Sequence, residues 1–512
     1  MLAQVKSGGI LGIDGYIVDV EVDAFPYLPL FNIVGLPDSA VKESKERVRT
    51  AIINSEFEFS EKYRLTVNLA PADVKKEGAS LDLPIAVGIL IATRQIRVTA
   101  LHEYAIVGEL SLDGGIRPIK GGISIALAAK AAGIKGILLP EANAQEAGVV
   151  EGIRVYPVNS LVEVARFLSG ELEINQYIVD INKLFSQDTQ DYLDFGEVGG
   201  QEHVKRALEV AAAGGHNVLM IGPPGSGKTM LAKRVPSILP DFVLHESIET
   251  TKIYSIMGLL PRDKALLTTR PFRSPHHTIS DAGLVGGGHN PRPGEISLSH
   301  NGVLFLDELP EFPRKVLESM RQPLEDRVVT ISRANERISF PANFMLISAM
   351  NPCPCGYLTD SSRECTCTPV QIQRYLAKIS GPLLDRIDIH IDVPRVSYND
   401  LVGQHNTRCS SDMRQRINCA RDIQLQRFNA NGIYTNSQMN ARHIKKYCQI
   451  NEKGGEMLRN VIDKLGFSAR AYDRILKVSR TIADIEGSPT ISESHISEAI
   501  QYRSLDREWW KM

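Results

Sequence analysis

The N-terminal third of the chain carries hydrophobic patterns of both strands and helices. Residues 16–22 and 65–69 have an apolar side chain at every second position, which is typical of strands with one buried face. Residues 123–132 are rich in alanine and predict a helix. The apolar run 137–139 predicts a short buried strand that ends at Pro140. This alternation predicts an N-terminal α+β domain.

A second mixed region follows, and a helical region closes the chain. The apolar runs 218–221 and 303–306 and the mostly apolar segment 344–350 have the length of buried strands in an α/β core. Apolar residues then recur at helical spacing between 462 and 482, and Ser492 with nearby glutamates opens a last helix. The predicted segments are an α+β domain at 1–170, a polar linker at 171–194, an α/β core at 195–395 and a helical domain at 396–512.

The composition is that of a globular protein without a strong overall charge. The 512 residues give room for about three domains of ~150 residues each. The net charge of −2 excludes a global basic field for nucleic acid. Residues 401–512 hold 18 Lys and Arg against 12 Asp and Glu, which fits either a nearby polyanion or a solvated helical face. Because we find neither a membrane-length apolar run nor a signal-peptide pattern, we expect a cytoplasmic protein with no membrane partner.

Residues 222–229 have the sequence of a phosphate-binding loop, placed between a predicted strand and a helix-like stretch. Glycines at such positions let backbone amides turn toward a phosphate. Lys228 would reach the β- and γ-phosphates, and the Thr229 hydroxyl would bind Mg²⁺. We expect the whole loop to bind ATP with Mg²⁺; its residues are Gly222, Pro223, Pro224, Gly225, Ser226, Gly227, Lys228 and Thr229.

Two carboxylates follow the predicted strand 303–306. Asp307 is placed to hold Mg²⁺ through water, and Glu308 to polarise the water that attacks the γ-phosphate. Phosphoryl transfer needs this division, because one carboxylate stays with the metal while the other orients the nucleophile. A plain junction between a strand and a turn is the alternative, which the phosphate-binding loop upstream disfavours.

Three further polar residues suit nucleotide hydrolysis. Asn351 ends the strand 344–350, where its amide can bind the attacking water or the γ-phosphate. Arg386 lies at a predicted surface turn and suits an arginine finger that reaches the γ-phosphate of a neighbouring subunit. Arg470 starts a predicted helix and suits contact with the nucleotide of its own subunit. A salt-bridged surface position is the alternative for both arginines.

The order of these elements resembles that of AAA+ ATPases: Walker A, Walker B, sensor 1, arginine finger and sensor 2. The stretches 273–277, 307–312 and 349–356 resemble more closely the magnesium-chelatase-like AAA+ family known as ComM/YifB, and the likeness runs across the chain. This resemblance implies an ATPase with a helical lid that assembles as a homo-hexamer. It also implies a helicase that acts on branched and single-stranded DNA and drives branch migration of recombination intermediates during natural transformation.

Residues 328–340 alternate around a polar tip and predict a β-hairpin. Related helicases grip DNA with a hairpin here, so the resemblance implies that Arg333 and Arg337 contact phosphates. The glycine-rich stretch 283–289 suits a second pore loop, and packing between domains or subunits is the alternative for both elements.

The adjacent pair His276 and His277 allows two interpretations. A helix start or a core pair is one, and a metal or phosphate role is the other.

Four of the seven cysteines fall within 15 residues: Cys353, Cys355, Cys365 and Cys367. In a reducing compartment, such clustering favours a metal over disulfides. Four thiolates complete a structural zinc site and leave no open position for catalysis. Free cysteines are the alternative, because the spacing is tighter than in the usual Cys-x-x-Cys pairs.

The N-terminal domain resembles the proteolytic domain of Lon proteases, on residues 76–80 and 108–112. Lon proteolysis needs a serine that a lysine activates. Ser80 falls at the serine position, but Ile123 occupies the lysine position. We therefore expect a non-proteolytic domain.

Two other lysines, Lys120 and Lys130, lie near Ile123 in sequence but on different predicted helical faces.

The DNA motor is the favoured function. An ATP-dependent Lon-like protease and a magnesium-chelatase-like remodelling ATPase are the alternatives.

Overall fold

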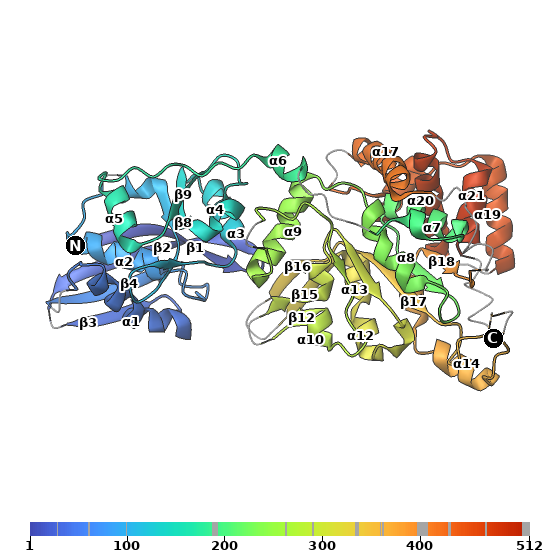
Figure 1. Cartoon of the computed structure of the whole chain (residues 1–512), viewed down its shortest axis with the longest axis horizontal. Helices are drawn as coiled ribbons and strands as arrows, with labels where there is room; N and C mark the ends of the chain where they lie inside the picture. The colour runs from blue at the N-terminus through green and yellow to red at the C-terminus, as the bar shows by residue number, and fades with distance from the viewer. Residues whose placement is uncertain are drawn as a thin grey trace. The chain divides into compact units, whose positions relative to one another are not determined.

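The structure, a computed structural model, describes most of residues 1–503. The residues outside the described part are 28, 60–61, 99, 187–192, 262–263, 289–290, 333–336, 359, 361–362, 397–407, 429–431, 466–467 and 504–512. The chain divides into two compact units (Figure 1). The first contains residues 1–189 and 244–268, and the second contains residues 190–243 and 269–512.

The first unit is built on a seven-stranded sheet of order β3-β4-β2-β1-β5-β8-β9. Its strands are β1 (Leu2–Leu11), β2 (Asp14–Pro26), β3 (Leu30–Val34), β4 (Tyr63–Ala70), β5 (Tyr104–Ile106), β8 (Gly136–Pro140) and β9 (Arg154–Val158), beside a small pair β6 (Glu109–Leu110) and β7 (Ile116–Arg117). The predicted strands lie within β2, β4 and β8 and are confirmed. In β2 the buried Val18, Val20 and Val22 alternate with polar residues, which is the pattern that predicted the strand.

Seven α-helices among the described residues belong to the first unit. They are α1 (Ser39–Asn54), α2 (Asp82–Ala92), α3 (Gly122–Ala131), α4 (Glu141–Ala147), α5 (Leu161–Leu168), α6 (Ile181–Ser186) and α9 (Leu244–Met257), with the 3-10 turn η1 (Leu101–Glu103). Helix α3 confirms the alanine-rich prediction. Helix α6 lies within the stretch that we predicted as a linker.

Helix α9 comes from far along the chain, yet packs in the first unit. The hydroxyl of Ser255 donates a hydrogen bond to the carboxylate of Glu146 on α4, and the Gly121 amide donates to that hydroxyl at 3.0 Å. Lys252 forms an ion pair with Asp14. Burial raises the pKa of Glu146, which its hydrogen bonds from Ser255, Asn143 and nearby backbone amides partly oppose. The polar contacts therefore tie residues 244–268 to the start of α3 and to α4.

The second unit contains a five-stranded parallel sheet of order β11-β14-β17-β10-β18. The strands are β11 (Phe272–Arg273), β14 (Val303–Leu306), β17 (Met345–Met350), β10 (Val218–Ile221) and β18 (Ile389–Asp392). The three central strands β14, β17 and β10 are fully buried, which explains why they are apolar except for Ser348 in β17. This arrangement confirms the predicted α/β core.

The remaining elements of the second unit surround this sheet. Its helices are α7 (Glu202–Gly214), α8 (Lys228–Arg234), α10 (Asp281–Leu284), α11 (Glu295–Leu298), α12 (Arg314–Ser319), α13 (Arg321–Asp326), α14 (Pro369–Leu376), α15 (Gly381–Leu384), α17 (Ser410–Phe428), α18 (Ala441–Tyr447), α19 (Glu452–Leu465), α20 (Ala469–Ile485) and α21 (Glu493–Gln501). Two hairpins are β12 (Gly286–Gly287) with β13 (Arg292–Pro293) and β15 (Val328–Ser332) with β16 (Arg337–Pro341); the 3-10 turns are η2 (Phe195–Glu197), η3 (Val235–Ile238), η4 (Leu309–Glu311) and η5 (Asn436–Gln438).

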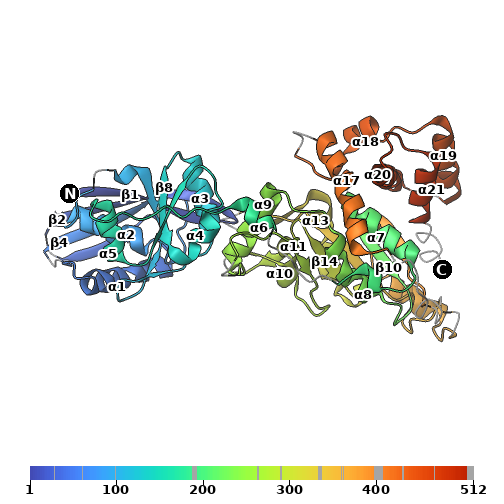
Figure 2. The same ribbon diagram turned by 45° about the horizontal axis from the view of Figure 1, so that its top comes forward.

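The C-terminal helices α17 to α21 pack on the sheet through α7, which lies against both α17 and α20 (Figure 2). The hydroxyl of Ser492 accepts a hydrogen bond from the His495 amide and caps α21, as the sequence predicts. Ser468 caps α20 in the same way.

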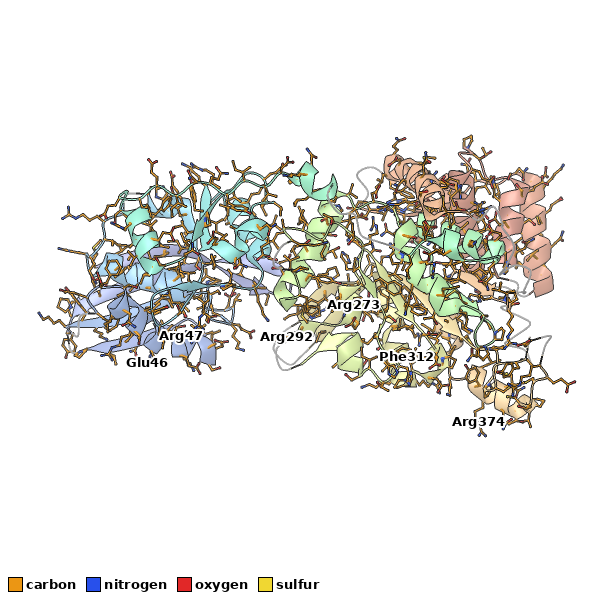
Figure 3. The ribbon with its side chains drawn as sticks, viewed as in Figure 1. Glu46, Arg47, Arg273, Arg292, Phe312 and Arg374 are labelled. Carbon is orange, nitrogen blue, oxygen red and sulfur yellow. The ribbon has the colours of Figure 1, made fainter. Side chains whose placement is uncertain are left out.

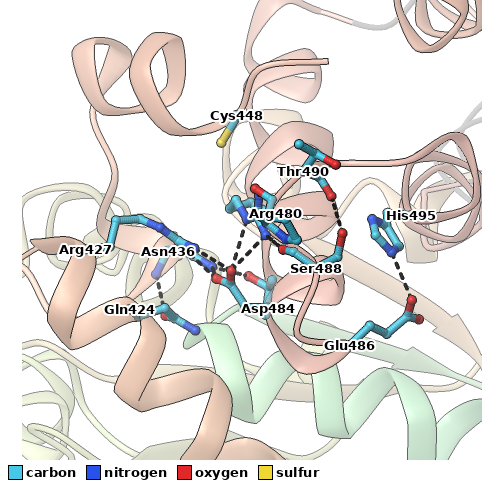
Figure 4. A network of polar contacts seen from close by, with 12 residues as sticks. Gln424, Arg427, Asn436, Cys448, Arg480, Asp484, Glu486, Ser488, Thr490 and His495 are labelled. Carbon is cyan, nitrogen blue, oxygen red and sulfur yellow. Dashed lines mark hydrogen bonds and ion pairs between the residues drawn. The ribbon is translucent and has the colours of Figure 1, made fainter. Parts of the chain in front are cut away.

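A buried carboxylate holds this helical region together. Asp484 on α20 is fully buried and accepts hydrogen bonds from Arg427 Nη1 at 2.7 Å, Asn436 Nδ2 at 2.7 Å and Arg480 Nε at 3.0 Å (Figure 4). These donors come from α17, η5 and α20. Burial lowers the pKa of Arg480, whereas Asp484 opposes that shift. One carboxylate thus connects three segments and balances the buried Arg480 and the partly buried Arg427.

We expect Asp484→Ala to destabilise the second unit by about 3–5 kcal/mol, because it leaves the buried Arg480 and the partly buried Arg427 without their carboxylate partner. Urea unfolding followed by circular dichroism measures this loss. Asp463→Ala, which removes an exposed carboxylate from α19, is the matched control and leaves stability within about 0.5 kcal/mol. A loss for Asp484→Ala no larger than the control would contradict the role of the network.

Candidate nucleotide-binding site

The predicted phosphate-binding loop joins the carboxyl end of β10 to the first residue of α8. Gly225 and Gly227 have φ angles of +77° and +89°, a backbone region that side chains disfavour. A Cβ on Gly222 would lie 2.2 Å from the carbonyl oxygen of Val393. The glycines are therefore required by backbone geometry, and their amides are left accessible to a phosphate.

Lys228 lies inside the loop. Its ammonium donates hydrogen bonds to the carbonyl oxygens of Gly222 at 2.7 Å and Pro223 at 2.9 Å, and to Asn351 Oδ1 at 3.2 Å. Burial lowers the pKa of Lys228 to about 8, although Asp307 and Asp392 nearby act in the opposite direction. Phosphate oxygens can replace these acceptors without moving the ammonium from the loop.

Asp307 and Glu308 lie at the same edge of the sheet as the phosphate-binding loop. Thr229 Oγ1 donates to Asp307 Oδ2 at 2.6 Å, so the predicted magnesium ligands are already neighbours. Hydroxyl and carboxylate oxygens are the donors that Mg²⁺ prefers. Asp307 follows β14 and Asn351 follows β17, next to β10 in the sheet. The structure thus brings the loop, Asp307, Glu308 and Asn351 together.

The histidine pair is a part of this site that the sequence left open. His276 and His277 follow β11, the neighbour of β14, and their ring centroids lie 4.0 Å apart. His277 Nδ1 lies 3.6 Å from Glu308 Oε2. Glu308 itself has a left-handed backbone with φ of +53°. His277 is therefore a direct partner of the predicted catalytic carboxylate, and only the pairing of β11 with β14 could have indicated it.

The two arginines lie at the opposite edge of the sheet. Arg386 and Arg470 line one cavity of 580 Å³ that also includes Asn217 and Asp388, the residues before β10 and β18. The phosphate-binding loop follows the other end of β10. Arg470 thus lies across the sheet from the phosphate-binding loop of its own subunit.

Arg386 is engaged within its own subunit. Its Nη1 donates to the carbonyl oxygen of Pro382 at 2.7 Å, and its Nη2 pairs with the carboxylate of Glu325. The side chain is only 11% exposed. A phosphate that approaches Arg386 would compete with the Glu325 carboxylate for this guanidinium.

The predicted hairpin is formed by β15 and β16, with Thr330 opposite Ser339. Arg337 lies exposed at the start of β16, whereas Arg333 lies outside the described residues. Part of the glycine-rich stretch forms β12, and a Cβ on Gly286 would lie 3.3 Å from Ile331 Cδ1 of the hairpin. The two candidate DNA-contacting elements are therefore neighbours.

The four clustered cysteines converge. Their sulfur atoms all lie within 4.8 Å of one another. The Sγ of Cys353 lies 3.3 Å from that of Cys355 and 3.7 Å from that of Cys365. This set of thiols is compatible with a structural zinc ion.

The Lon-like serine lacks a lysine partner among the described residues. Lys76 Nζ donates to the carbonyl oxygens of Pro71 and Val74, while Lys120 lies beside Gly258 and Lys130 beside Gly152. Ile123, at the expected lysine position, is fully buried.

Three family models match the chain. Magnesium chelatase subunit ChlI matches residues 194–401, a second model for the ChlI subunit of Mg-chelatase matches residues 20–143, and a ChlI C-terminal model matches residues 407–503. Within the described residues, no helix has both the length and the apolar character to cross a membrane.

Whole-chain relatives extend this likeness. The chain is 43% identical to Competence protein ComM of Haemophilus influenzae, over 99% of this chain and 98% of that protein. It is 42% identical to YifB of Escherichia coli over the same shares. The Lon protease of Halothermothrix orenii is 29% identical over only 30% of this chain and 21% of its own length, which supports the partial Lon-like character of the first unit.

Magnesium-chelatase-like AAA+ proteins use ATP and Mg²⁺, so this likeness indicates an ATPase. The site described above has the residues for both. From its domain matches and its similarity over the full length, the chain belongs to the ComM/YifB family of magnesium-chelatase-like AAA+ proteins.

Proposed function

We propose that this chain is an ATP-driven DNA motor that works as a homo-hexameric ring in the cytoplasm. It translocates as a helicase on branched and single-stranded DNA and promotes branch migration of recombination intermediates. The observation that supports a ring is the position of Arg386. It lies at the sheet edge opposite the phosphate-binding loop of its own subunit. A complete site then requires two subunits.

Within one subunit, the loop residues 222–229 bind the triphosphate, with Lys228 on the β- and γ-phosphates. Thr229 and Asp307 hold Mg²⁺, whose contribution when bound is to neutralise phosphate charge. Glu308 accepts a hydrogen bond from the attacking water, and Asn351 fixes the water or the γ-phosphate. His277 Nδ1 lies 3.6 Å from Glu308 Oε2, so its imidazole adjoins the carboxylate that would receive the water.

The neighbouring subunit supplies the remaining charge. Its arginine finger, Arg386, exchanges Glu325 for the γ-phosphate across the interface. Arg470 shares the cavity of Arg386, so the same geometry favours contact with the neighbour's nucleotide over contact with its own. Hydrolysis in this arrangement depends on assembly, whereas nucleotide binding does not.

DNA binding is assigned to the hairpin β15–β16 and the adjoining glycine turn. Arg337 is exposed there, and Arg333 belongs to the same hairpin in sequence. The name of the Haemophilus influenzae relative, a competence protein, supports a role in natural transformation. Packing of the hairpin between subunits is the competing use of the same surface.

We also assign structural zinc to Cys353, Cys355, Cys365 and Cys367. The convergence of four sulfur atoms supports this assignment. Four thiolates saturate the tetrahedral site, so the ion has a structural role and no catalytic one.

The motor is tested with Lys228→Ala and Glu308→Gln in a Holliday-junction branch-migration assay. We expect Lys228→Ala to lose ATP binding, and Glu308→Gln to bind ATP but hydrolyse it about 100-fold more slowly, with both failing to move junctions. Lys233→Ala, an exposed lysine on the same helix, is the matched control and keeps native activity. Equal activity in all variants would contradict the motor, and an inactive native protein would remove the DNA role.

The shared site is tested by mixing subunits. Arg386→Ala and Lys228→Ala are each expected to be inactive alone, while a mixture recovers roughly a quarter of native ATPase, because some interfaces then combine an intact loop with an intact finger. Steady-state ATPase after subunit exchange measures the recovery. No recovery in mixtures that form rings would show that Arg386 does not act across the interface.

The protease alternative is tested with labelled casein and ATP. We expect no degradation by the native protein and no change in Ser80→Ala, because Ser80 has no lysine to activate it. ATP-dependent degradation that Ser80→Ala abolishes would establish the alternative instead.

A further inference from the structure

The cysteine cluster lies directly against the phosphate-binding loop. Gly356, which follows Cys355, has a φ of +86°, and a Cβ there would lie 2.6 Å from Pro224 Cδ and 3.9 Å from Asn351 Cγ. The Gly356 amide also donates to Cys353 Sγ at 3.2 Å, which closes the turn 353–356. The turn is therefore packed so tightly on the loop that not even a methyl group fits between them.

The same turn continues from a residue of the ATP site. Only Pro352 separates Asn351 from Cys353, and Cys353 is fully buried. Asn351 Oδ1 in turn accepts the hydrogen bond from Lys228 at 3.2 Å. The position of Cys353 thus helps to determine where the Asn351 amide meets Lys228.

The other end of the cluster leads to a second wall of the site. Cys367 is followed by Thr368, which caps α14 together with Gln371. Helix α14 carries Arg374 (Figure 3) and the buried Tyr375. These two residues line a pocket of 430 Å³ together with Glu308, Asn351, Pro354, Glu311, Gln371 and Lys378.

The two ends of the cluster are joined through sulfur. The Cys355 amide donates to Cys367 Sγ at 3.3 Å, and Cys355 Sγ lies 3.5 Å from Cys365 Sγ. A metal ion bonded to all four thiolates would lock the turn 353–356 and the start of α14 into one body. Neutral thiols form only weak hydrogen bonds and cannot provide such a restraint.

We propose that the metal held by these four cysteines is a structural part of the ATP site, so that its presence determines the affinity for nucleotide. The ion supports Pro224 through Gly356, and Asn351 through Cys353. This inference rests on the proposed ATP and zinc assignments and adds a dependence between them. Loss of the metal releases one wall of the loop and raises the dissociation constant for ATP.

The first test uses the full chain, its zinc content by mass spectrometry and the binding of a fluorescent ATP analogue (mant-ATP) with Mg²⁺. We expect Cys365→Ser to lose zinc and to raise the dissociation constant at least tenfold. Cys419→Ser, which removes an exposed cysteine outside the cluster, is the matched control and retains both zinc and native affinity. Since a cysteine variant can misfold, native protein stripped by a chelator must show the same loss and regain affinity when Zn²⁺ is added.

A second variant separates the contact from the metal. Gly356→Ala is expected to keep its zinc but weaken mant-ATP binding, because the new methyl group displaces Pro224. Gly487→Ala carries a similar backbone strain, with φ of +66° but no atom within 4 Å of the added Cβ, and should bind mant-ATP as the native protein does.

The possible results distinguish failure of this inference from failure of the proposed ATP binding on which it rests. Native protein that binds no mant-ATP would contradict the ATP assignment and the inference with it. Native protein without zinc, or metal-free protein that binds mant-ATP within twofold of the native affinity, would overturn the inference while leaving the ATP site intact. Loss of affinity with the metal and recovery on its return would support it.

Discussion

Parallel pairing of β14, β17 and β10 is the constraint on which the candidate site depends. It places the carboxyl ends of three buried strands at one edge of a sheet, so that Thr229 meets Asp307 across 78 residues of sequence and Lys228 meets Asn351 across 123. The strands are apolar apart from Ser348 in β17, and Asp307 and Asn351 follow directly where β14 and β17 end. The chemistry is therefore concentrated where burial stops, as in other open parallel sheets.

The same sheet separates the two groups of residues that the proposed hydrolysis site combines. Its carboxyl edge holds the nucleotide-binding residues, and its amino edge holds Arg386 beside Glu325. The Arg386 guanidinium is stabilised by the Glu325 carboxylate, so it would exchange this partner only for a more highly charged one. In the proposed ring, the nucleotide of the neighbouring subunit would provide such a partner in the form of a phosphate. The ion pair can thus keep the finger ordered in an isolated subunit.

Local patterns predicted much of this structure, and long-range packing decided the rest. The strands, the hairpin β15–β16 and the capped helix α21 follow from periodicity and short motifs, which depend on neighbouring residues. The pairing of His277 with Glu308, the contact of Gly356 with Pro224 and the place of Arg470 depend on which segments the fold brings together. These contacts join segments that are distant in sequence. Local sequence patterns do not indicate which distant segments meet, so the sequence alone could not predict them.

Helix α9 has a consequence for the order in which the chain folds. The first unit consists of residues 1–189 together with residues 244–268, so the ribosome must release 268 residues before that unit has all its parts. Until then Glu146 lacks its hydrogen bond from the Ser255 hydroxyl, and the surface on which α9 packs stays exposed. The phosphate-binding loop, residues 222–229, has by that time already been synthesised. The first unit therefore cannot finish folding before synthesis of the second begins. Its last segment, residues 244–268, is made only after residues 190–243, which belong to the second unit.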